Sequence, residues 1–207
     1  MSSKRHWDTV YKSKAPTGVS WYQPHLTKSL QLISRTGIDT AGHLIDVGGG
    51  ASTLVDDLLD QGFRHVTVLD ISSEALNAAR SRLGERADGA VWIEADVAEA
   101  ALPHHGYQVW HDRAVFHFLT RVQDRQRYVR AVHHALQPGG HLIIATFGLN
   151  GPTRCSGLEI VRYSPETLRV EFGEEFTLLE SLDEEHQTPF GTQQAFIYCY
   201  FRRSATS

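Results

Sequence analysis

The chain has 207 residues, a formal net charge of −4 at pH 7 and a hydrophobic content of 41%. That length suits one domain with a sizeable core, so we expect a single unit over 1–207, with an N-terminal segment, 1–40, and a core, 41–207. The mild acidity argues against a nucleic-acid partner, and the lack of an apolar run of roughly eighteen residues or a signal-peptide core predicts a cytoplasmic protein that contacts no membrane.

The first predicted element of the core is a short apolar strand, His43 to Val47, which enters a glycine-rich turn. Gly48 and Gly50 allow a tight turn and a close approach of the backbone to a ligand. Ser52 or Thr53 can cap a helix from Thr53 to Gln61, whose free N–H groups would face the same ligand. The pattern is typical of a nucleoside-cofactor loop, although glycines also end strands for structural reasons alone.

Acidic residues close the strands that follow. A strand from His65 to Asp70 ends in a carboxylate about twenty residues after the turn, the spacing of a ribose-binding acid; Asp70 could otherwise cap the next helix, Ser73 to Leu83. Further strands are predicted at Val91 to Glu94 and Tyr107 to His111. Since parallel strands end at one edge of a sheet, we expect a shared crevice lined by four acids: Asp46, Asp70, Asp96 and Asp112.

The last third of the chain alternates helix and strand signals. A helix from Asp124 to Leu136 stops at the Gln137 to Gly140 turn and leads into a strand, His141 to Phe147. A short helix begins at Ser164 and Pro165 and closes at Gly173. Two final strands, 176–182 and 194–202, are joined by a loop and are therefore antiparallel. The whole pattern predicts an α/β fold.

Taken together, these features resemble the class I S-adenosylmethionine-dependent methyltransferases, from about Leu44 to the C-terminus. The resemblance implies a doubly wound, Rossmann-like, mostly parallel seven-stranded sheet with an antiparallel last strand and helices on both faces. It also implies S-adenosyl-L-methionine as the cofactor. The roles carried over are the methionine end for Asp46, Gly48 and Gly50, the ribose for Asp70 beside Ile71, and the adenine for Asp96 and Val97.

Two stretches carry narrower resemblances. The N-terminal residues 6–11 and 20–22 look like those of small bacterial methyltransferases and of eukaryotic lysine methyltransferases acting on elongation factor or citrate synthase, whose aromatic residues cover the cofactor. Residues 110–115 look like the substrate side of thiopurine and thiol methyltransferases. These resemblances point to different acceptors. The first resemblance makes Tyr11, Trp21 and Tyr22 candidates for covering the cofactor, although each could equally be an ordinary packing residue. Tyr22 and Arg113 are also candidates for contacting the substrate.

Methyl transfer from a sulfonium needs positioning above all, and an aromatic lid can exclude water and favour the cation. The acceptor must also lose a proton unless it is already an anion. The nearest candidate bases are His111 and Asp112 at the end of the fourth strand, and His117 one or two turns on if residues 113–119 are helical. Each can equally be a packed residue, and Arg113 could bind an anionic acceptor or pair with Asp112.

The two cysteines, Cys155 and Cys199, form no disulfide framework and no Cys-x-x-Cys site, and neighbouring histidines diverge, so we expect no bound metal. Cys155, in the loop after the fifth strand, could meet a soft substrate or be an ordinary thiol.

We expect a methyltransferase acting on a sulfur, nitrogen or oxygen atom of a small molecule. The alternatives are a protein lysine methyltransferase and a non-catalytic binding module. A nicotinamide dehydrogenase fits less well because Thr53 stands at the third glycine position of its fingerprint. The sequence predicts no oligomeric state.

Overall fold

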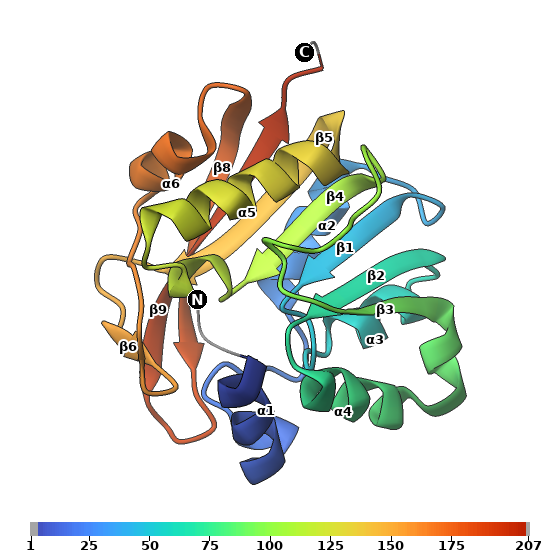
Figure 1. The fold of residues 1–207 in the computed structure, drawn as a ribbon, viewed down its shortest axis with the longest axis vertical. Coiled ribbons are helices and arrows are strands. Elements are labelled where there is room, and N and C mark those ends of the chain that lie inside the picture. The colour runs from blue at the N-terminus through green and yellow to red at the C-terminus, as the bar shows by residue number, and fades with distance from the viewer. Residues whose placement is uncertain (1–3, 206–207) are drawn as a thin grey trace.

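The computed structural model describes residues 4–205, in which one seven-stranded sheet runs through the molecule (Figure 1). The strand order is β3-β2-β1-β4-β5-β9-β8, and β6 and β7 form a separate hairpin. The strands are β1 (His43–Val47), β2 (His65–Asp70), β3 (Ala90–Glu94), β4 (Tyr107–Arg113), β5 (Leu136–Phe147), β6 (Arg154–Cys155), β7 (Leu158–Glu159), β8 (Phe176–Gln187) and β9 (Gln193–Arg203). The helices are α1 (Lys4–Ser13), η1 (Pro16–Gly18), α2 (Thr27–Thr36), α3 (Leu54–Asp60), α4 (Ser73–Leu83), η2 (Gly84–Gly89), η3 (Phe116–Phe118), α5 (Val122–Ala135) and α6 (Pro165–Phe172).

Helices cover both faces of the sheet because its central strands are apolar on both sides. Along β5, Leu142 and Ile144 pack in one core cluster with residues of α5 and α6, whereas Ile143 and Ala145 pack in a second cluster with residues of α2, α3 and α4. The predicted doubly wound fold is confirmed. Strands β1 to β5 are parallel, and β9 is antiparallel to both β5 and β8.

Several boundaries differ from the predicted ones. The helix expected from Thr53 begins at Leu54, and the one expected from Asp124 begins at Val122. The Gln137 to Gly140 turn is a bulge within β5, where the pairing with β4 jumps from Leu136 to His141. The short helix after Ser164 is confirmed, with a capping box between Ser164 and Thr167.

The last two strands are longer than predicted, because β8 continues to Gln187 through a stretch of acidic residues that carries no apolar alternation. Pairing with β9 holds that stretch extended. The antiparallel arrangement itself is confirmed.

The sheet order reverses between β1 and β4, so the carboxyl ends of these two strands flank the point where α/β sheets bind ligands. Helix α1 lies just beyond that edge, beside α4 (Figure 1). Within residues 4–205, no helix has the length and apolar character needed to cross a membrane.

Candidate functional site

Two adjoining cavities open at this edge of the sheet. The first encloses about 780 Å³ and the second about 460 Å³, each counted with the space at its mouth. Both are lined by Tyr11, Trp21, Gly48 and Arg113, so the two cavities form one crevice. The first also takes in Asp70, Ile71, Asp96, Val97, Phe118 and Cys155, and the second Tyr22, Gln23, Asp46, Gly49, Ser52 and His111.

The glycine-rich turn forms the floor of this crevice. Gly48 has a positive φ of 71°, and a Cβ there would lie 1.9 Å from Val115 Cγ2. Gly49, which the sequence analysis did not select, lines the second cavity, and a Cβ there would lie 2.3 Å from Asp46 Oδ2. The predicted ligand contact of Gly50 is not supported, because Gly50 packs behind the wall: its N–H donates to Asp70 Oδ2 at 3.0 Å, and it lines neither cavity.

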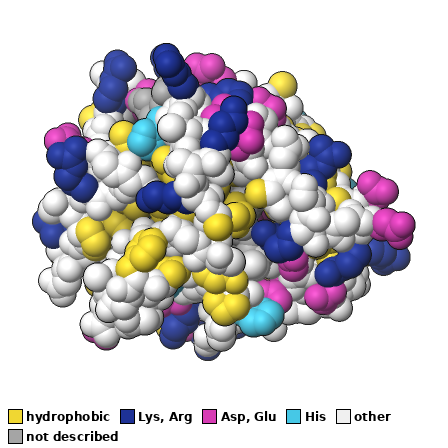
Figure 2. Space-filling model, turned by 90° about the horizontal axis from the view of Figure 1, so that it is seen from below, with side chains coloured by type: hydrophobic (Ala, Val, Ile, Leu, Met, Phe, Trp, Pro, Cys, Tyr) yellow, Lys and Arg dark blue, Asp and Glu magenta, His cyan; other side chains and the backbone are white. Residues whose placement is uncertain are grey.

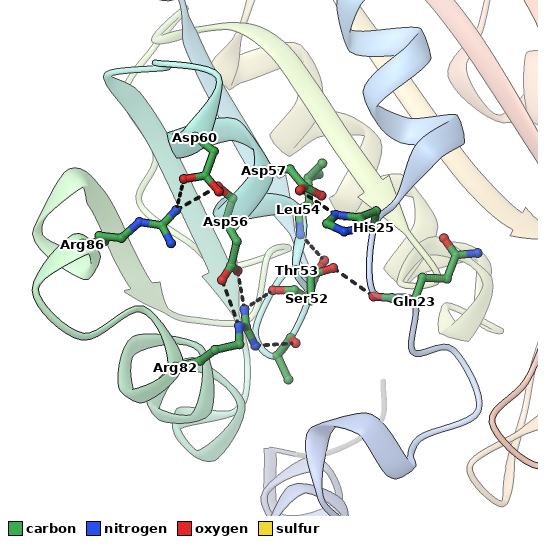
Figure 3. Close-up of polar contacts among 11 residues, drawn as sticks. Gln23, His25, Ser52, Thr53, Leu54, Asp56, Asp57, Asp60, Arg82 and Arg86 are labelled. Atoms are coloured by element: carbon green, nitrogen blue, oxygen red, sulfur yellow. Dashed lines mark hydrogen bonds and ion pairs between the residues drawn. The ribbon is translucent and has the colours of Figure 1, made fainter.

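The turn is braced by Arg82 of α4, as Figure 3 shows. The Arg82 guanidinium donates to the carbonyl oxygens of Ala51 and Ser52 at 3.2 and 2.6 Å and to both carboxylate oxygens of Asp56. Neither Ser52 nor Thr53 makes the usual side-chain cap of α3, since the Ser52 hydroxyl accepts only from the Leu54 N–H. Thr53 makes no cap bond and instead donates to the Gln23 carbonyl at 2.9 Å, which ties the N-terminal segment to the turn (Figure 3).

Asp70 and Asp96 face the first cavity from the ends of β2 and β3. Asp70 accepts hydrogen bonds from the N–H groups of Gly50 and Ser72 at 3.0 and 2.8 Å, and burial raises its pKa to about 6. Asp96 accepts from the Ala98 N–H at 3.0 Å, and partial burial raises its pKa as well. Carboxylates with spare lone pairs suit hydroxyl and amino donors of a ligand.

Asp46 lies in the second cavity and is held by His111. Asp46 Oδ1 accepts from His111 Nδ1 at 2.7 Å, and His111 Nε2 lies 2.9 Å from the hydroxyl of Ser29 on α2. Both His111 nitrogens are therefore occupied, and His111 positions Asp46. Asp46 Oδ2 is buried and has no hydrogen-bond partner. Ser29 was missed by the sequence analysis, although a serine beside Leu32 and Ile33 on the apolar face of α2 is a detectable signal.

The prediction that all four acids line one crevice is wrong for Asp112. Its side chain is fully buried and lines neither cavity. Asp112 Oδ2 accepts from the Tyr128 hydroxyl at 2.5 Å and from the Phe116 N–H at 3.1 Å, and Oδ1 accepts from the Val115 N–H at 2.9 Å. Asp112 thus fixes the turn after β4, and burial raises its pKa to about 6.

His117 is also fully buried and lines neither cavity. The segment after β4 forms only the short 3-10 turn η3, which directs the imidazole between Phe118 and Phe147. Its Nδ1 accepts from the Phe147 N–H at 3.3 Å, and burial lowers the pKa of His117 to about 3. An imidazole in this position packs the core and is too weak a base to hold a proton near neutrality.

Aromatic side chains close the first cavity from the N-terminal side. The Trp7 ring contacts those of Phe118 and Trp21 with centroid distances of 5.0 and 5.9 Å, and Tyr11 and Trp21 lie 6.2 Å apart. From this end, hydrophobic side chains gather in the middle of the face, with most charged ones around them (Figure 2). Trp7 and Phe118 join the predicted Tyr11 and Trp21; no sequence pattern selects Phe118.

Helix α1 is held in place by polar contacts and has no fully buried residue. Lys4 pairs with Asp8 at 2.6 Å and with Glu94 at 3.2 Å. The Ser72 hydroxyl donates to Asp8 Oδ1 at 2.7 Å, while the Ser72 N–H donates to Asp70. The cover over the first cavity is therefore fastened next to Asp70.

Of the predicted substrate-side residues, Arg113 lines both cavities, whereas Tyr22 and Cys155 line one each. Arg113 is buried and donates to the Tyr198 hydroxyl and the Trp21 carbonyl, each at 2.9 Å, and its Nη2 lies 3.6 Å from Glu184 without a hydrogen bond. Tyr22 lines the second cavity and Cys155 the first. Burial raises the pKa of the Cys155 thiol to about 11, so this thiol is protonated near neutrality.

Comparison with known proteins finds similarity to methyltransferases. A family model described as "Methyltransferase domain" matches residues 45–142. The chain is 21% identical to human EEF1A lysine methyltransferase 2 over 196 residues, which span 88% of this chain and 77% of the human protein.

Solved structures share the fold. One, from work on the conversion of a disulfide bond into a thioacetal group during echinomycin biosynthesis, superimposes with a TM-score of 0.80 at 21% identity and covers 99% of this chain and 93% of that one. Another is the Burkholderia thailandensis 1,6-didemethyltoxoflavin-N1-methyltransferase with bound 1,6-didemethyltoxoflavin and S-adenosylhomocysteine, with a TM-score of 0.67 at 21% identity over 98% of this chain and 84% of that one.

Proposed function

Because this chain is an S-adenosylmethionine-dependent methyltransferase with a Rossmann-like seven-stranded sheet, we propose that it methylates a sulfur, nitrogen or oxygen atom of a small-molecule acceptor. The observation that carries the proposal is the aromatic lining of the first cavity, to which Trp7, Tyr11, Trp21 and Phe118 contribute.

The second cavity suits the amino-acid end of the cofactor. It holds one buried carboxylate oxygen, Asp46 Oδ2, and one buried guanidinium nitrogen, Arg113 Nη2, neither of which has a hydrogen-bond partner. A buried polar group without a partner costs about 1–3 kcal/mol. An ammonium group beside Asp46 and a carboxylate beside Arg113 would satisfy both, and S-adenosylmethionine carries this pair of charges on its methionine end.

The first cavity suits the nucleoside end. Asp70 would accept hydrogen bonds from the ribose hydroxyls beside Ile71, and Asp96 with Val97 would hold the adenine. Gly48 leaves room for the ligand because its backbone, without a side chain, forms the floor shared by the two cavities. The bound cofactor supplies an electrophilic methyl group on a positively charged sulfur.

The protein contributes position and a dry environment. Trp7, Trp21 and Phe118 exclude water from the place where the acceptor meets the methyl group, and their ring faces favour positive charge. Holding two reactants in near-attack geometry supplies roughly 7–11 kcal/mol in favourable cases. Arg113 holds Trp21 in this arrangement through its carbonyl.

The likeness to human EEF1A lysine methyltransferase 2 over most of the chain favours a second candidate, protein lysine methylation. A third possibility is a module that binds the cofactor without turnover.

Titration calorimetry with S-adenosylmethionine, S-adenosylhomocysteine and NAD tests the cofactor site first, and binding of NAD in place of the other two would contradict the proposal. The protein is then incubated with cofactor labelled in the methyl group and a panel of thiols, thioethers, amines and phenols. Label in a small product supports the proposal. Label that appears only in protein bands of a lysate favours lysine methylation, and binding without any transfer favours the non-catalytic module.

A further inference from the structure

We propose that the acceptor attacks with a neutral heteroatom that carries no proton, of which a thioether sulfur is the simplest case, and leaves the site as a methylated cation. This inference rests on the proposed function and narrows its acceptor class. The observations behind it are the aromatic enclosure of the first cavity and the lack of a free base among the described residues that line it.

The sheet order separates the two ends of the first cavity. Asp96 follows β3 and Asp70 ends β2, whereas Arg113 ends β4 and Cys155 lies beyond β5. In the order β3-β2-β1-β4-β5, these two pairs stand on opposite sides of β1. With the nucleoside at the Asp70 and Asp96 end, the acceptor occupies the end beside β4 and β5.

The acceptor end suits a cation. The ring centroid of Trp7 lies 5.9 Å from that of Trp21 and 5.0 Å from that of Phe118. The Trp21 and Phe118 rings are nearly perpendicular to the Trp7 ring, at interplanar angles of 83° and 77°. All three rings line the first cavity, and aromatic rings attract sulfonium and quaternary ammonium groups. Asp70 and Asp96 carry two potential negative charges against one positive charge on Arg113, which Glu184 already faces at 3.6 Å.

No titratable side chain described at the first cavity can take a proton from an acceptor at that end. The titratable side chains there are Tyr11, Asp70, Asp96, Arg113 and Cys155. Burial raises the pKa of Tyr11 and of Cys155, so both keep their protons, and the guanidinium only donates. The two carboxylates stand at the nucleoside end, and each accepts backbone N–H bonds.

The bases predicted from sequence are engaged elsewhere. His111 lines only the second cavity, with its two nitrogens at Asp46 and Ser29. Asp112 and His117 are fully buried and line neither cavity.

The balance of the reaction agrees with this arrangement. The acceptor lone pair forms the new bond to the methyl carbon, the carbon–sulfur bond of the cofactor breaks, and its electron pair stays on the cofactor sulfur. The positive charge moves from one sulfur to the acceptor atom, so the site holds the same charge before and after and no proton is transferred. A primary amine, thiol or phenol would have to deliver a proton to a base as well.

The test measures the product-like complex. The protein is saturated with S-adenosylhomocysteine, and calorimetry then compares benzyldimethylsulfonium with benzyl methyl sulfide. Since S-adenosylhomocysteine fills the cofactor site with a neutral sulfur, a preference for the cation belongs to the acceptor end. We expect the sulfonium to bind at least tenfold more tightly. Equal or weaker binding of the sulfonium overturns the inference, as does failure of both probes while S-adenosylhomocysteine binds.

If S-adenosylhomocysteine itself does not bind, the proposed function fails and the inference with it. Phe118→Leu and Trp7→Leu are expected to reduce the preference for the sulfonium at least threefold. Phe190→Leu is the matched control, because Phe190 is 63% exposed in the turn between β8 and β9 and lines neither cavity. A loss of preference in Phe190→Leu equal to that in Phe118→Leu would overturn the assignment to the aromatic cluster. If Phe118→Leu does not fold, the sulfonium preference of Trp7→Leu is compared with that of Phe190→Leu instead.

Discussion

Replacing Gly48 with alanine tests the floor of the crevice directly. Two effects combine at this position. The φ of 71° lies in the left-handed region, which costs a residue with a Cβ roughly 1–2 kcal/mol. The new methyl group would also lie 1.9 Å from Val115 Cγ2, and overpacking of this kind costs about 1–3 kcal/mol more.

The chain offers a matched control for the backbone effect. Gly37, which ends α2, has a φ of 72°, but nothing lies within 4 Å of a Cβ built there. Gly37→Ala should therefore lose only the conformational part. The difference between the two variants isolates the contact with Val115, about 1–3 kcal/mol, or roughly 2–12 °C in melting temperature for a chain of this size.

Thermal and urea unfolding of both variants measure that difference, and calorimetry measures the affinity for S-adenosylmethionine. Because Val115 lines the first cavity, Gly48→Ala should also weaken cofactor binding, whereas Gly37→Ala should not. The double variant Gly48→Ala with Val115→Ala should regain part of the lost stability, as a coupling of about 1–3 kcal/mol. If Gly48→Ala is no less stable than Gly37→Ala, the close packing argument is refuted.

Three further predictions concern the polar groups of the site. Because the pKa of Asp70 is raised to about 6, the protein should bind S-adenosylmethionine about tenfold more weakly at pH 5 than at pH 7. Protonation of Asp70 should at the same time stabilise the unliganded fold. Calorimetry should find that the affinity of Asp70→Asn does not change between these pH values. Arg82→Ala should weaken cofactor binding three- to tenfold and Arg86→Ala, whose guanidinium reaches no carbonyl of the turn, should not; equal losses would contradict the brace. His111→Leu leaves Asp46 without its donor, so urea unfolding should record a loss of about 1–3 kcal/mol, and an unchanged stability would refute this role.

The sequence predicts the strands well, and it predicts the lining of the crevice where a residue stands at the end of a strand. Asp70 and Asp96 were placed by strand ends and by spacing, and both face the first cavity. The doubly wound sheet and its antiparallel last strand are confirmed. Periodicity and turn chemistry are local properties, so they survive folding.

Side-chain direction is what the sequence could not supply. Asp112 stands one residue after His111 in a strand, so the two side chains leave opposite faces of the sheet. His111 reaches Asp46 and the crevice, while Asp112 turns to Tyr128 on the α5 side. His117 turns inward because η3 is a single 3-10 turn, a local geometry that no periodic pattern marks.

Two buried polar atoms of the second cavity that lack hydrogen bonds link stability to function. Asp46 Oδ2 and Arg113 Nη2 are buried without hydrogen bonds, while His111, Tyr198 and Trp21 fix the rest of their side chains. In the free protein the unpaired Asp46 Oδ2 costs about 1–3 kcal/mol, whereas Arg113 Nη2 lacks a hydrogen bond but faces Glu184 at 3.6 Å, which offsets part of its cost. A ligand with opposite charges at the matching positions removes both costs at once. Relief of this cost therefore contributes to the affinity for the ligand. A variant in which another side chain of the protein hydrogen-bonds Asp46 Oδ2 or Arg113 Nη2 should be more stable to unfolding and should bind S-adenosylmethionine more weakly.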